Sequence, residues 1–89
     1  MQLIWTKNAW DEYLYWQSRD KAITKKINAL IRDIARDPFS GIGKPEPLKH
    51  KYKEKWSRRI DEANRLIYTY KLDSEETIVI FQCAGHYEQ

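Results

Sequence analysis

The hydrophobic period of this 89-residue chain changes once, and a segment rich in proline and glycine marks the change. Before Pro38, apolar residues recur three and four positions apart, which is typical of amphipathic helices. After Pro47, apolar and polar residues alternate, which is typical of strands. Residues 38–47 hold all three prolines and two of the three glycines, and we interpret them as a loop. The helices are therefore expected before this loop and most of the strands after it.

The first half predicts one short strand followed by two helices. Residues 2–5 form a short apolar run that we interpret as a strand, and Thr6 is a suitable N-cap for the helix that follows. Asp20 is expected to cap a second helix, which should end before Pro38. The two helices should then be joined at residues 17–19 in a tight antiparallel hairpin.

The second half predicts strands at residues 56–61, 65–70 and 77–83, with a further short strand possible near Leu48. The last run is too apolar for a strand that meets water on both faces. We expect an α+β fold in a single domain over residues 1–89. The helical hairpin should pack on one face of a twisted, mainly antiparallel sheet, and the other face should stay partly open.

The positive charge is concentrated in the middle of the chain. The sequence has 16 Lys and Arg against 13 Asp and Glu, a net charge of +3. Residues 44–65 hold eight of the basic and four of the acidic residues, so this segment has a net charge of +4 and the remainder −1. Such a segment indicates a polyanionic partner, most often nucleic acid, with a solvated lysine-rich loop as the alternative.

Several classes of protein are disfavoured by composition. No apolar run approaches the roughly 20 residues of a membrane span. The N-terminus lacks the basic and apolar regions of a signal peptide, so a cytoplasmic location is expected. Cys83 is the single cysteine, which excludes an internal disulfide, and with two histidines it leaves too few ligands for a structural zinc site. We expect Cys83 to fill space in a buried strand.

Four features could carry chemistry. Glu46 stands between two prolines, which fix the backbone and aim its carboxylate, although a solvated loop carboxylate has the same sequence signature. His86 directly follows the last strand, where an exposed bystander is the alternative. The other two features are basic. The first is a set of arginines that could form an anion clamp across adjacent strands or merely flank a sheet edge: Arg58, Arg59 and Arg65. The second resembles either a nucleic-acid surface with stacking aromatics or an exposed loop, and it consists of Lys49, His50, Lys51, Lys53 and Lys55, interleaved with Tyr52 and Trp56.

Together these residue types suit metal-independent cleavage of RNA, in which the 2′-hydroxyl attacks the adjacent phosphate. The reaction needs a base for the 2′ proton and an acid for the leaving 5′ oxygen. It also needs fixed cations to stabilise the negative charge of the transition state. Glu46 could be the base and His86 the acid, with Arg65 and either Lys49 or Arg59 as the cations. No cofactor is required.

The chain also resembles a known family. The stretches 3–5, 10–17, 43–50, 56–60, 65–68 and 86–87 look like those of the YoeB/Txe toxins, which belong to the RelE-like mRNA interferase superfamily of bacterial type II toxin–antitoxin systems. The most specific stretch is Gly-Lys-Pro-Glu-Pro-Leu-Lys at residues 43–49. The similarity runs in order from Met1 to Tyr87.

The resemblance implies a microbial-ribonuclease-like fold and cleavage of messenger RNA in the A site of the 70S ribosome. It also implies a homodimer and neutralisation by a YefM-type antitoxin. By this resemblance Glu46 corresponds to the general base, His86 to the general acid and Arg65 to the transition-state arginine. Lys49 and Arg59 correspond to supporting cations, and Tyr87 to an aromatic that positions the substrate.

The sequence departs from the family pattern near two of these residues. Ala63 and Asn64 replace a carboxylate and a histidine that many relatives carry before the arginine, and Glu62 could supply the missing carboxylate. Glu88 and Gln89 extend the chain past the terminal tyrosine, and Gly85 adds backbone freedom beside His86. Two other functions stay open: a toxin of the same fold that acts on gyrase, and a non-catalytic RNA-binding module.

Overall fold

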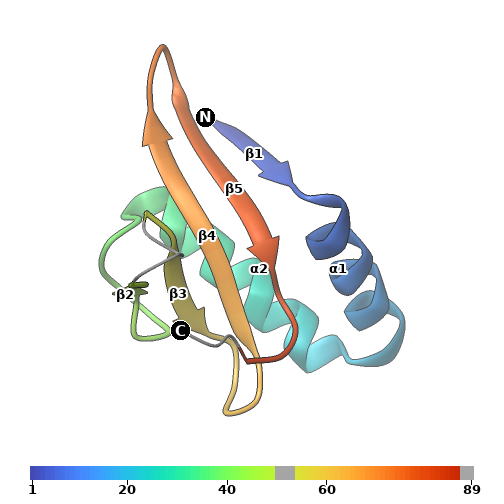
Figure 1. The fold of residues 1–89 in the computed structure, drawn as a ribbon. Coiled ribbons are helices and arrows are strands. Elements are labelled where there is room, and N and C mark those ends of the chain that lie inside the picture. Colours follow the sequence, from blue (N-terminus) through green and yellow to red (C-terminus); the bar gives the residue numbers. More distant parts are fainter. Residues whose placement is uncertain (50–53, 87–89) are drawn as a thin grey trace.

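A computed structural model describes residues 1–49 and 54–86 of the chain. The described residues form, in order, β1 (Gln2–Trp5), α1 (Lys7–Arg19), α2 (Lys21–Arg36), β2 (Glu46–Pro47), β3 (Trp56–Arg59), β4 (Arg65–Leu72) and β5 (Glu76–Gln82) (Figure 1). No helix in this part of the chain is long and apolar enough to cross a bilayer.

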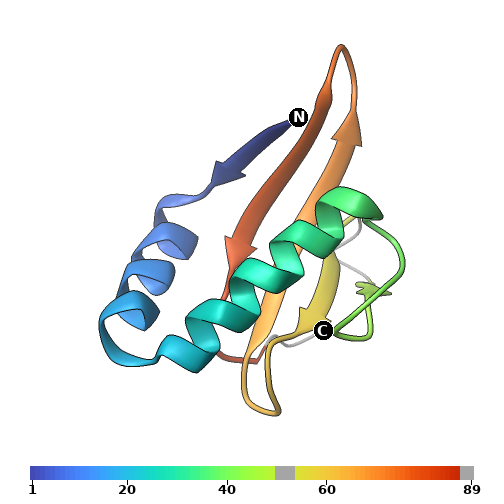
Figure 2. The same ribbon diagram turned by 180° about the vertical axis from the view of Figure 1, so that it is seen from behind.

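The strands form one mixed sheet in the order β1-β5-β4-β3-β2. β1 runs parallel to β5, and the other three neighbouring pairs are antiparallel. The last strand of the chain therefore lies inside the sheet, between β1 and β4, which accounts for its apolar sequence. Both helices lie on the same face of the sheet (Figure 2), and the expected α+β fold is confirmed.

The core lies between α2 and the sheet. α2 buries Ile27, Leu30 and Ile34, whose spacings of three and four residues place them on one side of the helix. The sheet contributes fully buried side chains from its two longest strands, namely Leu66, Tyr68, Ile78 and Ile80. Because side chains alternate along a strand, the residues that alternate with these four along β4 and β5 lie on the opposite face, away from the helices.

The joint between the helices is shorter than expected. α1 continues through residues 17–19, and Asp20 alone separates the two helices. Its backbone N–H donates to the Trp16 carbonyl at 2.8 Å, and its carboxylate accepts the Ile23 N–H at 3.1 Å. Asp20 thus caps the end of α1 and the start of α2, which removes the need for a longer loop. The Thr6 cap is confirmed, since the Thr6 hydroxyl accepts the Ala9 N–H.

The short strand expected near Leu48 is β2, immediately before that residue. The Leu48 N–H extends the pairing by donating to the Lys55 carbonyl at 2.8 Å. Cys83 is fully buried after β5, and its thiol donates to the Ala9 carbonyl. Burial raises the pKa of the Cys83 thiol to about 12, so it fills space and does not supply a thiolate at neutral pH.

Candidate active site

Glu46 is held on the sheet edge by its neighbours on both sides. It pairs with Ser57 of β3, and Pro47 pairs with Trp56. Before it, the Gly43 carbonyl accepts the Arg59 N–H at 2.7 Å; after it, the Leu48 N–H is bonded to β3 as described above. The backbone around Glu46 is therefore anchored while its side chain is exposed to solvent.

Arg59 and Arg65 lie on the same face of the sheet as Glu46. Arg59 of β3 pairs with Arg65 of β4. Arg59 is two residues along β3 from Ser57, which pairs with Glu46. Because side chains alternate along a strand, these positions share the face away from the helices. Neighbouring strands are about 4.8 Å apart, so β2 and β4 are separated by about 10 Å. Flexible arginine side chains can span that separation.

The Arg65 guanidinium is partly engaged at the end of the β3–β4 hairpin. One of its terminal nitrogens donates to the backbone carbonyls of Asp61, Glu62 and Asn64, at 2.6, 3.3 and 3.2 Å. These contacts fix the direction of the side chain. The second terminal nitrogen has no such contact among the described residues and can donate to an anion.

His86 lies beside Arg65 because the residue before it is anchored. The Arg65 N–H donates to the Gly85 carbonyl at 3.0 Å, and the Gly85 N–H donates to the Asn64 side-chain oxygen at 2.7 Å. The Gln82 side chain donates to the carbonyls of both Gly85 and His86. Gly85 has a φ of +79°, so its backbone freedom is used to make this turn, while the His86 side chain remains exposed.

Sequence reasoning missed Asn64 and Gln82 as residues that position the segment of the candidate acid. Both hold the His86 segment through bonds to its backbone. Asn64 drew attention only as a departure from the family pattern, and here its side chain supports the candidate acid. No local signal marks such bonds, because Asn64 and Gly85 are 21 residues apart.

The remaining candidates are less constrained. Lys49 is exposed just after β2, three residues along the chain from Glu46. The Lys55 ammonium lies 4.1 Å from the centre of the Phe81 ring. Tyr87 falls outside the described residues, as do His50, Lys51, Tyr52 and Lys53.

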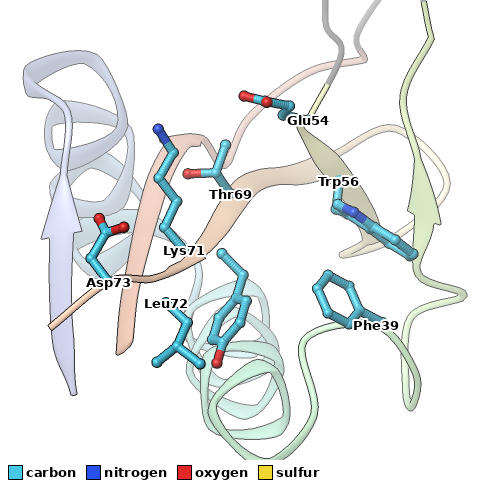
Figure 3. Close-up of a pocket in the computed structure, with 8 residues that line it drawn as sticks. Phe39, Glu54, Trp56, Thr69, Lys71, Leu72 and Asp73 are labelled. Atoms are coloured by element: carbon cyan, nitrogen blue, oxygen red, sulfur yellow. The ribbon is translucent and has the colours of Figure 1, made fainter. Parts of the chain in front are cut away.

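Trp56 does not belong to a stacking surface with the lysines. It faces the helix side of the sheet, where its ring centre lies 4.9 Å from that of Phe39 (Figure 3). With Tyr70, these aromatics line a pocket of about 440 Å³ at the start of β3. The expected interleaving of Trp56 with the lysines is therefore wrong, since strand alternation turns Lys55 and Trp56 to opposite faces.

Arg58 is not part of an anion clamp either. Its side chain is completely buried on the helix side, where it forms an ion pair with Asp33 of α2 at 2.6 Å. Its remaining N–H groups donate to the Tyr68 hydroxyl and to three carbonyls of the loop after α2, those of Asp37, Ser40 and Ile42. A guanidinium with all these partners holds the loop that leads to Glu46 and cannot also bind a substrate anion.

The bonds to Asp33 predict a pH dependence of stability. The Ile42 N–H, Arg58 and Arg36 donate to this carboxylate and lower its pKa from 3.8 to about 2. A carboxyl with a depressed pKa in the folded state stabilises the fold above its unfolded-state pKa, and this contribution is lost as the pH falls toward 2. We expect the unfolding free energy, measured with urea, to fall between pH 4 and pH 2. The fall should be smaller in Asp33→Asn; an equal fall in both proteins would contradict the assignment.

One face of the sheet thus carries an anchored carboxylate and two arginines, and the backbone of the His86 segment is held beside one of these arginines. A carboxylate can accept a proton, an imidazole can donate one and guanidinium groups can stabilise developing negative charge. Among the described residues, no group of three His, Cys, Asp or Glu side chains is placed to hold a metal ion. The arrangement is suited to acid–base chemistry at a phosphodiester.

Comparison with known proteins identifies the family. Residues 5–87 match the model for the YoeB-like toxin of bacterial type II toxin–antitoxin systems. The chain belongs to this family. The toxin YoeB of Escherichia coli K12 is 53% identical over 98% of this chain and all of its own length.

Solved structures of the family superpose closely on this chain. A YoeB/ParE toxin from Agrobacterium tumefaciens is 44% identical, with a TM-score of 0.94 over 98% of this chain and 100% of its own. YoeB of Staphylococcus aureus is 40% identical, with a TM-score of 0.87 and 98% of both chains covered. That toxin is known as a dimer and as a heterotetrameric complex with YefM. The expected membership of the YoeB family is therefore confirmed.

Proposed function

We propose that this toxin is a ribosome-dependent endoribonuclease that cuts messenger RNA in the A site and so inhibits translation. The observation that supports the proposal is that Glu46 and Arg65 share one face of the sheet and that the backbone before His86 is bonded to Arg65. These groups supply the base, the cation and the acid that metal-independent cleavage requires. The family resemblance supports the ribosome as the place where cleavage occurs, which would place the toxin in the cytoplasm.

In the proposed mechanism, the Glu46 carboxylate removes the proton of the 2′-hydroxyl, and the oxygen attacks the adjacent phosphorus. The 5′ oxygen leaves as His86 donates a proton to it. Arg65 and Arg59 stabilise the additional negative charge while five oxygens surround the phosphorus, and Lys49 and Tyr87 help to hold the substrate. The products are a cyclic phosphate and a new 5′-hydroxyl end.

The proposed partners follow from the family and from the exposed surface. The S. aureus complex supports neutralisation by a YefM-type antitoxin, and the S. aureus dimer supports a homodimer. The edge formed by β1 and α1 offers an apolar interface for a second copy, since Ile4, Trp10 and Leu14 are each more than 40% exposed there. Such a cluster of exposed apolar residues is typical of a protein-binding surface.

Mapping the cut sites tests the proposal. The purified toxin should cleave a translated message only when ribosomes are present, and primer extension should locate the cuts at codons in the A site. The downstream fragment should accept phosphate from a polynucleotide kinase without prior phosphatase treatment, because its new end is a 5′-hydroxyl. Binding to RNA without any new RNA ends would indicate a non-catalytic module. Inhibition of gyrase without cleavage of RNA would indicate a different target. Either result would overturn the proposal.

A further inference from the structure

A second cluster of cations lies beside Arg59, on the rim of the sheet. Lys26 of α2, Lys44 of the loop before β2 and Arg59 of β3 line one hollow of about 340 Å³. Three separate elements thus contribute basic residues to the lining of the same concave surface. Arg59 belongs both to the lining of this hollow and to the candidate active face, so the hollow borders that face at Arg59.

These cations are available to a ligand. Among the described residues, no carboxylate lies within ion-pair distance of Lys26, Lys44 or Arg59. Two acidic residues also line the hollow, but Asp61 is already engaged, because its carboxylate accepts the N–H groups of Ala63 and Asn64 and the Asn64 side chain. These neutral donors leave its charge in place, so the three cations of the hollow face two carboxylates, those of Asp61 and Glu62, and are in excess by one.

The backbone of the loop is an independent sign that Lys44 is there for its side chain. Lys44 has a φ of +51°, in the left-handed region that glycine and asparagine adopt more readily. The preceding residue, Gly43, also has a positive φ, and a Cβ there would approach the Leu30 side chain to 2.7 Å, so the loop packs tightly at this point. A lysine kept in a costly conformation within a tightly packed loop is the kind of outlier that marks a functional contact.

We propose that Lys26, Lys44 and Arg59 form a second phosphate subsite, which binds the RNA backbone outside the scissile phosphate. The inference rests on the proposed function, because it takes RNA as the ligand. A polynucleotide suits the hollow better than an isolated anion, since its next phosphates continue from the candidate active face onto the rim. The phosphate belongs either to the message or to ribosomal RNA.

Substitution of the two lysines tests the subsite without touching the candidate acid and base. Lys26→Gln removes one charge, and Lys44→Gly removes another while relaxing the left-handed backbone. Lys25→Gln is the matched control, because Lys25 is the neighbouring exposed lysine on α2 and does not line the hollow. Thermal unfolding of all three variants should match that of the wild type, which separates binding from folding.

The expected result is a weaker salt dependence of ribosome binding. Each phosphate contact contributes about 0.7–0.9 to the slope of log affinity against log salt. The slope of log affinity against log salt should therefore be shallower by that amount in each lysine variant than in the wild type. The ratio of wild-type to variant affinity should then shrink about threefold between 50 and 200 mM salt. The control should keep the wild-type slope. Unchanged slopes and affinities in both variants would overturn the subsite.

Two further comparisons assign the contact. A deficit with vacant and programmed ribosomes alike identifies ribosomal RNA as the ligand, whereas a deficit only with programmed ribosomes identifies the message. Reduced affinity for the antitoxin together with normal ribosome binding would overturn the proposal, because the hollow would then serve an acidic protein. Failure of the wild-type toxin to cleave would count against the proposed function, which this binding assay does not measure.

Discussion

Glu46→Gln should lower the rate of message cleavage by about 10²–10⁴-fold, because a neutral amide cannot accept the 2′-hydroxyl proton. His86→Ala should have an effect of similar size by removing the proton donor for the leaving oxygen. Single-turnover cleavage of ribosome-bound message, followed by primer extension, measures both rates. Ribosome affinity should change little, since neither group is expected to contribute much to binding.

The design excludes a trivial loss of structure. Glu46 and His86 are exposed, so both variants should unfold at the wild-type temperature. Glu75→Gln is the control for the loss of a carboxylate, because Glu75 is exposed in the turn before β5, at the far end of β4 from Arg65. Wild-type cleavage rates in either site variant would disprove the assigned roles.

Arg58→Met should remove a large part of the stability of the fold. The substitution leaves the Asp33 carboxylate and the loop carbonyls without the donor that they share, and breaking a buried ion pair in this way costs about 3–5 kcal/mol. The free energy of unfolding of a small domain is only about 5–15 kcal/mol in total. Urea unfolding at neutral pH should show a large drop in midpoint.

Arg59→Met provides a matched control for the adjacent residue. Its side chain is exposed on the other face, so its effect on the unfolding free energy should stay within about 0.5 kcal/mol. Arg58→Lys separates charge from geometry, because a lysine keeps the ion pair but lacks the planar fork that reaches several carbonyls at once. Equal midpoints for Arg58→Met and Arg59→Met would show that the buried network contributes nothing.

The sequence was sufficient to predict the elements because local rules dominate there. The change of period placed the helices before residue 38 and the strands after residue 47, and the caps at Thr6 and Asp20 were predicted from residue type alone. The position of β1 beside β5 could not be obtained in this way. Pairing between the two ends of the chain depends on how the whole sheet packs against the helices, and no short-range pattern encodes it.

The arginines show both what a pattern can reveal and where it fails. Alternation along β3 put Arg58 on the same face as Trp56 and Ile60 and opposite to Arg59, so the face was predictable. The role of Arg58 was not predictable, because a charged residue is rarely buried without a partner. Its partner, Asp33, is 25 residues away in the sequence. The location of His86 was not predictable either, because it depends on the side chains of Asn64 and Gln82 elsewhere in the chain. The stiffness of the backbone around Glu46, in contrast, could be inferred from the prolines on either side of it.

The pairing of β1 with β5 has a consequence for synthesis of the chain. The first strand can find its partner only after the last strand has been made, so the sheet cannot close while the C-terminal residues are still inside the ribosomal exit tunnel. His86, which lies beyond β5, emerges later still. A nascent copy therefore lacks both a finished sheet and its candidate acid until β5 and the residues after it have left the tunnel.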